Sequence, residues 1–267
     1  MNVAFYQSCP IYGDVDYNLF TALGTLGSTK SDLYVLPELF STGYLFGSRK
    51  ELGDLAEPIP SGPTTRELIQ FCRSERCAIV AGVAEKEGKK FYNSAILVGP
   101  RGLIGKYRKT HLFNQEKLWF HPGNTGFQVW RYKNARIGLM ICFDWIYPEA
   151  ARALALKGAD IICHPSNLVL PYCQAAMKTR SIENRVFTIT ANRVGKEIKG
   201  KVELTFSGSS QITDPLGGVL ARASEATERI MAVKIRPEQA RNKKATPGNQ
   251  IFRDRRPVYY KDLTKRV

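Results

Sequence analysis

The chain has 267 residues, 43% of them hydrophobic, which is enough for a sizeable core and excludes a disordered protein. No apolar run approaches the roughly 18 residues that a membrane helix needs, and residues 1–10 lack the basic and apolar segments of a secretory signal, so we expect a cytoplasmic protein. The formal net charge of +15 excludes an acidic protein and requires that nucleic-acid or anion binding be considered.

The hydrophobic pattern predicts strands and helices that alternate along the whole chain. Strands are predicted at residues 1–8, 31–39, 78–86, 91–100, 102–113, 127–134, 135–142, 159–167, 186–195 and 228–235, with a hairpin at 208–224. Helices are predicted at residues 14–27, 61–77, 147–158 and 171–185. No long polar linker interrupts this series, so the sequence predicts a layered α/β protein with a single domain at residues 1–235.

The remaining residues, 236–267, form a basic C-terminal extension. Together with Lys234 they hold eleven Lys and Arg against three acids, which is about half of the net charge. The chain has no RNA-binding or helix-turn-helix signature. We therefore expect the extension to pack on a neighbouring surface or to lie in solvent, with no specific nucleic-acid partner.

The six cysteines are expected to be free thiols. None forms a Cys-x-x-Cys pair, and no histidine lies near Cys72 and Cys77, which are the closest two. A zinc site is therefore not expected. A cytosolic chain of this length rarely contains disulfides, so most of these cysteines need no explanation beyond burial.

Polar residues of three kinds come near the ends of apolar runs. Glu38 comes after DLYVLP, Lys109 after GLIGKYR, and Cys142 after RIGLMI. Open α/β sheets build their sites where strands end, so these side chains are candidates for one site. A carboxylate can accept a proton, a thiol can act as a nucleophile, and an ammonium group can stabilise an oxyanion.

Each candidate also has a purely structural interpretation. Cys142 lies in a strand–Cys–turn–helix pattern typical of a nucleophile elbow, but buried cysteines are common in strands. In the structural interpretation, Glu38 is an acid paired with a nearby base, and Lys109 is one of several charges on a solvated edge strand. The residues alone leave both interpretations open.

A cysteine–histidine dyad is an alternative arrangement. His164 ends the strand that follows Cys142, and a right-handed crossover would bring both residues to the same edge of the sheet. Asp144 would then be the acid that orients the imidazole. Spacing alone does not exclude this arrangement.

Three segments resemble signature regions of the nitrilase, or carbon–nitrogen hydrolase, superfamily. They are LPELFSTGY, YRKTHLFNQEKLWFHPGN and IGLMICFDWIYPEAARALALKGADIICHPSN. The resemblance runs from Met1 to about Ile235. It implies a four-layer α-β-β-α sandwich that forms a homodimer or a larger homo-oligomer, with the C-terminal extension packing at the subunit interface.

The resemblance also implies the chemistry. Glu38 would be the general base, Cys142 the nucleophile, and Lys109 with the backbone N–H of Phe143 the oxyanion donors. Glu116 occupies the place of a second acid that positions the lysine and the substrate. The reaction would proceed through a thioester and need no metal or organic cofactor. Lys109 and the following helix would favour the Cys142 thiolate, whereas the two glutamates would oppose it.

The residues that follow Cys142 indicate which branch of the superfamily the chain resembles. Phe143 and Asp144 resemble the amidase and carbamoylase branches rather than true nitrilases. Ile146 stands where many ω-amidases have an arginine, which argues against a substrate carboxylate. The remaining pocket candidates are Trp145, Tyr147 and Asn167.

We therefore expect a hydrolase that acts on a small amide or N-carbamoyl compound. A nitrile hydrolase of the same fold is the alternative within the family. A non-catalytic anion or nucleic-acid binding protein is the alternative from another class.

Overall fold

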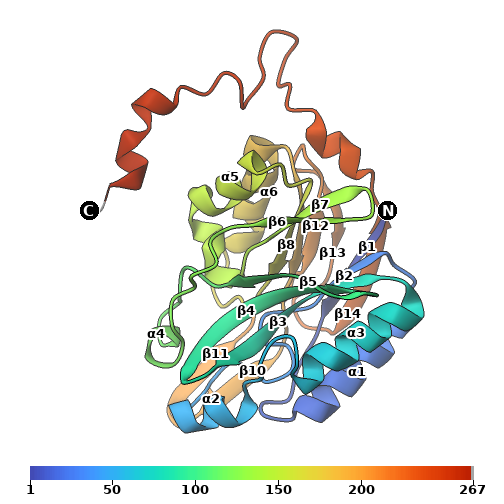
Figure 1. The fold of residues 1–267 in the computed structure, drawn as a ribbon, viewed down its shortest axis with the longest axis vertical. Helices are drawn as coiled ribbons and strands as arrows, with labels where there is room; N and C mark the ends of the chain where they lie inside the picture. Colours follow the sequence, from blue (N-terminus) through green and yellow to red (C-terminus); the bar gives the residue numbers. More distant parts are fainter. Residues whose placement is uncertain (266–267) are drawn as a thin grey trace.

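The first of two six-stranded sheets is built around the N-terminal strand. The computed structural model describes residues 1–265, and the sheet runs in the order β14-β1-β2-β3-β4-β5 (Figure 1). Its strands are β1 (Asn2–Gln7), β2 (Leu33–Val35), β3 (Ala78–Glu87), β4 (Lys90–Gly99), β5 (Gly102–Arg108) and β14 (Arg229–Lys234). The strands β1, β2 and β3 are parallel, and the other neighbours pair antiparallel.

The second sheet has the same pattern of parallel strands flanked by antiparallel ones. It runs in the order β13-β12-β9-β8-β7-β6, with β7, β8 and β9 parallel. Its strands are β6 (Val129–Tyr132), β7 (Ala135–Leu139), β8 (Ile161–Pro165), β9 (Phe187–Ala191), β12 (Gln211–Thr213) and β13 (Val219–Arg222). The hairpin predicted at residues 208–224 is the pair β12–β13.

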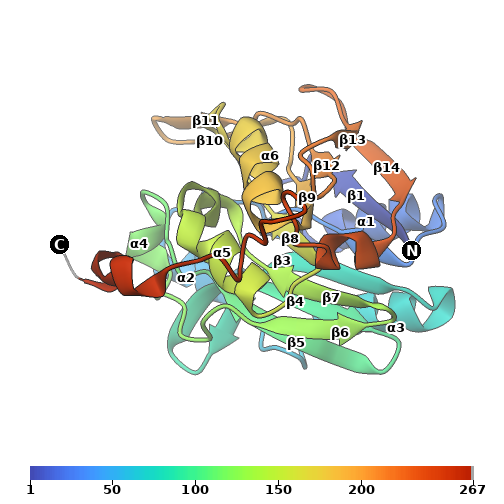
Figure 2. The ribbon, with the colours of Figure 1, turned by 90° about the horizontal axis from the view of Figure 1, so that it is seen from above.

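Helices cover the outer face of each sheet, so the layers are α-β-β-α (Figures 1 and 2). The helices α1 (Val15–Gly27) and α3 (Pro63–Glu75) lie on the first sheet, and α5 (Pro148–Leu156) and α6 (Cys173–Asn184) lie on the second. The alternation along β1 explains this packing, because Val3 and Phe5 belong to one core cluster and Ala4 and Tyr6 to another. The predicted single-domain sandwich is confirmed.

Four short elements were not predicted. They are the helices α2 (Arg49–Leu55) and α4 (Glu116–Trp119) and the strands β10 (Lys196–Lys199) and β11 (Val202–Thr205). The strands β10 and β11 form a two-stranded sheet of their own beside the main body. The predicted strands at 102–113 and 135–142 are too long, since β5 ends at Arg108 and β7 ends at Leu139. A 3₁₀ helix at Cys142–Ile146 follows β7.

The C-terminal extension first follows its own subunit and then leaves it (Figure 2). Ala240 is buried, Arg241 forms an ion pair with Asp160, and the ring of Phe252 lies against Arg152 and Lys243. The 3₁₀ turns at Pro257–Tyr259 and Lys261–Thr264 bury no side chain. Packing at a subunit interface therefore stays a prediction for this part.

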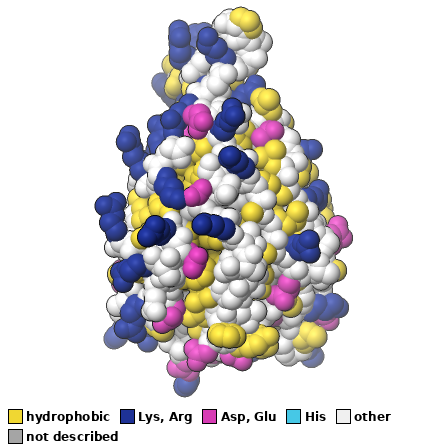
Figure 3. Space-filling model, turned by 90° about the vertical axis from the view of Figure 1, so that its right-hand side faces the viewer, with side chains coloured by type: hydrophobic (Ala, Val, Ile, Leu, Met, Phe, Trp, Pro, Cys, Tyr) yellow, Lys and Arg dark blue, Asp and Glu magenta, His cyan; other side chains and the backbone are white. Residues whose placement is uncertain are grey.

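One face of the molecule is mixed in charge (Figure 3). Figure 3 shows Lys and Arg side chains scattered over one face of the molecule, with acidic and hydrophobic side chains between them. Among residues 1–265, no helix combines the length and the apolar character that crossing a bilayer requires.

Candidate active site

Glu38 and Lys109 meet at one edge of the first sheet. Glu38 follows β2, Lys109 follows β5, and both strands point the same way although β3 and β4 lie between them. The Lys109 Nζ donates to Glu38 Oε1 at 2.7 Å, and Asn93 Nδ2 on β4 donates to the same oxygen at 2.7 Å. Both members of the ion pair are fully buried, so their charges interact without the screening of bulk water.

The backbone at Glu38 lies unusually close to β3. A Cβ atom on Gly82 would approach the Glu38 Cα to 2.4 Å, a distance that would force the two segments apart. Glycine at position 82 therefore lets the segment that follows β2 lie against β3. This close approach holds Glu38 within reach of Lys109 and Asn93.

Glu116 completes a buried cluster of two carboxylates and one ammonium group. It opens α4, and its Oε1 accepts from Lys109 Nζ at 2.6 Å and from the hydroxyl of Tyr44 at 2.6 Å. Burial and the charge of Glu38 raise the pKa of Glu116 to about 7, against the opposing effect of Lys109. Burial also lowers the pKa of Lys109, but the charges of Glu116 and Glu38 outweigh it, so Lys109 stays protonated.

Cys142 occupies a strained turn between β7 and α5. Its φ of 38° lies in the left-handed region, which a residue with a side chain rarely adopts. The Asp144 carboxylate fixes the turn, since its Oδ2 accepts from the backbone N–H of Ile141 at 2.8 Å and from the hydroxyl of Tyr107 at 2.8 Å. The strand–Cys–turn–helix prediction agrees with this geometry.

The Cys142 thiol keeps its proton at rest. Burial and the charge of Glu38 raise its pKa well above the ordinary value, although Lys109 acts in the opposite direction. The stabilisation of the thiolate that we expected from Lys109 and the following helix is therefore outweighed. The Sγ lies 3.7 Å from the backbone oxygen of Asn167, its acceptor in the resting site.

The His164 ring contacts the backbone of Cys142, and among residues 1–265 no hydrogen bond joins it to the Cys142 sulfur. Its Nε2 lies 2.8 Å from the Cys142 backbone oxygen, which only accepts, so this nitrogen carries the hydrogen. Burial lowers the pKa of His164 to about 4 and keeps the ring neutral. Asp144 contacts His111 at 2.7 Å and is committed to the turn. The cysteine–histidine alternative is therefore not assembled.

The aromatic candidates separate into two groups. Phe143 lies against Phe113 with ring centroids 5.0 Å apart, and Tyr147 stacks on His111 at 3.7 Å. Trp145 is 6% exposed and packs within the main core cluster. Phe143 and Tyr147 thus form an aromatic group immediately after the cysteine, whereas Trp145 anchors the turn to the core.

Several buried polar atoms near Cys142 lack a partner within residues 1–265. They are Glu38 Oε2, Asn93 Oδ1 and both side-chain atoms of Asn167. A buried polar atom without a hydrogen bond destabilises the fold. A polar ligand that bonds to these atoms would offset this cost. Within the same residues, no group of three or more His, Cys, Asp or Glu is arranged to hold a metal ion.

Tyr44 and Asn93 were not among the sequence-based candidates. Asn93 has a weak signal, since it is a polar residue inside an apolar strand. Tyr44 lies in a loop seven residues beyond Pro37, and nothing in its spacing indicates that its hydroxyl reaches Glu116.

Comparison with known proteins agrees with the resemblance inferred from the sequence. Residues 2–245 match the carbon-nitrogen hydrolase family. The chain is 48% identical to a nitrilase of Pyrococcus abyssi, with 97% of this chain and 99% of the relative aligned. It is 37% identical to an (R)-stereoselective amidase of Pseudomonas sp, over 84% and 81% of the two chains. It is 32% identical to an N-carbamoylputrescine amidase of Solanum lycopersicum, over 94% and 90%.

A solved structure shares the whole fold. The crystal structure of a carbon-nitrogen hydrolase from Helicobacter pylori G27 superposes with a TM-score of 0.87 and 28% identity, covering 100% of this chain and 98% of that one. The family match and the relatives named as nitrilase and amidases show an enzyme rather than a non-catalytic binding protein. The family match, the relatives and the shared sandwich together show that the chain belongs to the carbon–nitrogen hydrolase family and is a hydrolase of the nitrilase superfamily.

Proposed function

We propose that the protein hydrolyses the C–N bond of a small neutral amide or N-carbamoyl compound, with Cys142 as the nucleophile. The observation that carries this proposal is the buried Glu38–Lys109–Glu116 cluster, whose charges act directly on the thiol of the strained Cys142 turn. A base, a nucleophile and a cation are the groups that acyl transfer needs.

The first step forms a thioester. Glu38 takes the Cys142 proton as Sγ attacks the carbonyl carbon, and Lys109 with the Phe143 N–H stabilises the oxyanion. The C–N bond breaks, and Glu38 returns the proton so that ammonia or an amine leaves. The high pKa of the resting thiol favours this order, because proton removal and attack then coincide.

The second step releases the acid. Water gives a proton to Glu38 and adds its oxygen to the thioester carbon, the C–S bond breaks, and the proton returns to Cys142. An amide yields a carboxylic acid and an N-carbamoyl compound yields a carbamic acid, which loses CO₂; in both cases the thiol is freed and the hydrolysis consumes one water. Glu116 would hold Lys109 in position through both steps, since it accepts from Nζ at 2.6 Å.

Asn167 is our candidate for recognising the substrate. Its side-chain amide is buried, and the Oδ1 and Nδ2 atoms have no partner among the described residues. Its backbone oxygen lies within reach of the Cys142 thiol. A carboxamide presents a donor and an acceptor side by side, which matches a primary amide or a carbamoyl group. Lys109 is occupied by two carboxylates, and Ile146 is apolar, which favours a neutral substrate.

A nitrile is the second candidate substrate. The observation in its favour is the 48% identity to a protein named nitrilase. A nitrile carbon would be attacked by the same thiol, and two waters would then be consumed instead of one.

The test is ammonia release from matched amide, N-carbamoyl and nitrile compounds that share one side chain. We expect release from the amide or the carbamoyl compound and a loss of at least about a thousandfold in Cys142→Ala. Cys163→Ala is the control, because Cys163 is another buried thiol in the core, on β8. Equal release by wild type and Cys142→Ala would overturn the proposal.

A further inference from the structure

We infer that the β10–β11 hairpin holds Tyr44 in place and that the Tyr44 hydroxyl positions Glu116 against Lys109. This inference rests on the proposed function, because it concerns the same site. Tyr44 acts through Glu116 and not on the substrate itself, and Glu197 on β10 is the group that fixes Tyr44.

Tyr44 reaches Glu116 from a segment with no regular structure. Its hydroxyl donates to Glu116 Oε1 at 2.6 Å, and its ring packs edge-on against Phe206 with centroids 6.1 Å apart. The segment between β2 and α2 contains no strand or helix at Tyr44. Contacts from elsewhere in the fold must therefore fix the position of the hydroxyl.

Glu197 supplies those contacts. Its carboxylate accepts the backbone N–H of Tyr44 at 3.0 and 3.1 Å and that of Leu45 at 2.7 Å, while the side chain is almost fully buried. A Cβ on Gly43 would lie 2.9 Å from Glu197 Oε1, so the neighbouring glycine makes room for the carboxylate.

Arg193 in turn fixes Glu197. Its guanidinium is buried, forms an ion pair with the Glu197 carboxylate, and lies 4.1 Å from the centre of the Phe206 ring. It also donates to the backbone oxygen of Pro10 at 3.2 Å. A buried carboxylate that is paired and hydrogen-bonded in this way has one well-defined position.

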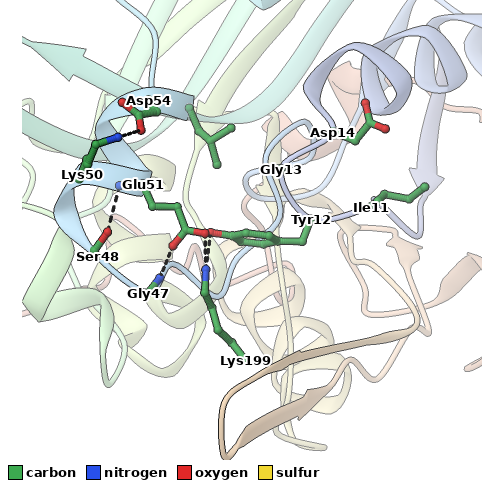
Figure 4. A pocket seen from close by; sticks show the side chains of 11 residues that line it. Ile11, Tyr12, Gly13, Asp14, Gly47, Ser48, Lys50, Glu51, Asp54 and Lys199 are labelled. Carbon is green, nitrogen blue, oxygen red and sulfur yellow. Dashed lines mark hydrogen bonds and ion pairs between the residues drawn. The ribbon is translucent and has the colours of Figure 1, made fainter.

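A second contact fastens the far end of the same segment. Figure 4 shows Lys199 pointing at the Glu51 carboxylate beside the Tyr12 ring, with Glu51 also accepting the N–H of Gly47 at 2.7 Å. These residues line a hollow of about 950 Å³ at the surface. The hairpin therefore contacts residues 43–51 at two points. Glu197 contacts the segment near the active site, and Lys199 contacts it at the surface hollow.

The consequence for catalysis lies in Glu116. Lys109 and Tyr44 both donate to the same oxygen, and Lys109 is shared with Glu38. The Tyr44 hydrogen bond favours the ionised form of Glu116, against burial and the Glu38 charge, which raise its pKa. Without the hydroxyl, Glu116 takes up a proton at a higher pH and its ion pair with Lys109 weakens.

The test compares two conservative variants with matched controls. Tyr44→Phe removes only the hydroxyl, and Tyr17→Phe does the same at an exposed position on α1. Glu197→Gln removes one buried charge, and Glu203→Gln removes one from an exposed surface pair on β11. The measurement is the pH dependence of kcat and kcat/KM for the best substrate of the panel.

We expect Tyr44→Phe to lower kcat about tenfold, as for loss of one hydrogen bond to a charged group, with little change in KM. The acidic limb of its profile moves to higher pH, because the Tyr44 hydrogen bond lowers the pKa of Glu116. Glu197→Gln should also lower kcat and move the acidic limb of the profile to higher pH. In the double variant the two losses do not add, because Glu197 acts through Tyr44.

Wild-type profiles in Tyr44→Phe, or fully additive losses, would overturn the inference. Wild-type ammonia release separately decides the proposed function. If the wild type releases none, the pH dependence of Cys142 alkylation by iodoacetamide, followed by peptide mass spectrometry, gives the same comparison. An unshifted alkylation profile in both variants would then contradict the inference.

Discussion

Among single residues, the resting proton on Cys142 sets the first requirement of the reaction. Burial and Glu38 raise the pKa of the thiol, so very little thiolate exists near neutral pH. A base must therefore act at the moment of attack. Glu38 is the carboxylate whose charge acts most strongly on the thiol, and one of its oxygens, Oε2, has no partner among residues 1–265.

Glu38→Gln should abolish hydrolysis, whereas His164→Gln should retain most of it. The first change removes the base and should lower kcat/KM by about a thousandfold. The second keeps an N–H that can donate to the Cys142 carbonyl oxygen, which is the contact that His164 makes. Steady-state kinetics on the same amide would check both. A comparable loss in the two variants would revive the cysteine–histidine dyad.

The sequence predicted the residues at strand ends but not those that support them. Glu38, Lys109 and Cys142 were recognisable because a polar residue after an apolar run is a local signal. Tyr44 gave no such signal, because its role depends on Glu197, which lies 153 residues away along the chain. Long-range contacts of this kind come from packing that one sequence does not display.

At the scale of single elements, the turn that carries Cys142 is under backbone strain. A left-handed conformation costs a residue with a Cβ roughly 1–2 kcal/mol, and the φ at Cys142 is 38°. Strain of this kind is often found where a side chain must be presented to a ligand.

Cys142→Gly should be at least as stable as Cys142→Ala in urea unfolding. Glycine relieves the strained φ, which offsets its greater loss of backbone entropy. The control is Ala153→Gly inside α5, where the same change should lower the free energy of unfolding by about 1 kcal/mol. If the free energy of unfolding of Cys142→Gly were about 1 kcal/mol lower than that of Cys142→Ala, the backbone at this position would not be strained.

The missed elements are all short and partly exposed. The strands β10 and β11 have four residues each, and in β10 the buried residue is Glu197 while Ile198 is exposed, so hydrophobicity does not mark the strand. The long helices α1 and α3 and the buried strands were predicted because burial imposes a clear period on them. The hairpin that grips Tyr44 is therefore the part of the site that the sequence predicts least.

For the molecule as a whole, the end of the C-terminal extension exposes apolar side chains that the single chain does not cover. Val258, Tyr259 and Leu263 are each more than half exposed. The turns that carry them bury no side chain, although Leu263 also lines a surface hollow beside Pro148 and Glu149 of α5. We propose that they bury their apolar surface against a second copy of the chain.

Tyr259→Ser combined with Leu263→Ser should shift the protein from dimer towards monomer. The cause would be the loss of apolar area at the interface. The molar mass at a fixed concentration, measured by light scattering after size exclusion, checks this. Tyr17→Ser with Phe20→Ser removes two exposed aromatic residues from α1 and serves as control. An unchanged mass in the first double variant would argue against an interface there.

If Cys142 carries the acyl group, peptide mass spectrometry after acid quenching should detect it there. During turnover of an amide substrate, we expect a mass gain equal to the acyl group on the peptide that contains Cys142. The adduct should be absent in Cys142→Ala and present in Cys163→Ala. An acyl group on another residue, or full turnover with no adduct and an active Cys142→Ala variant, would show that Cys142 is not the nucleophile.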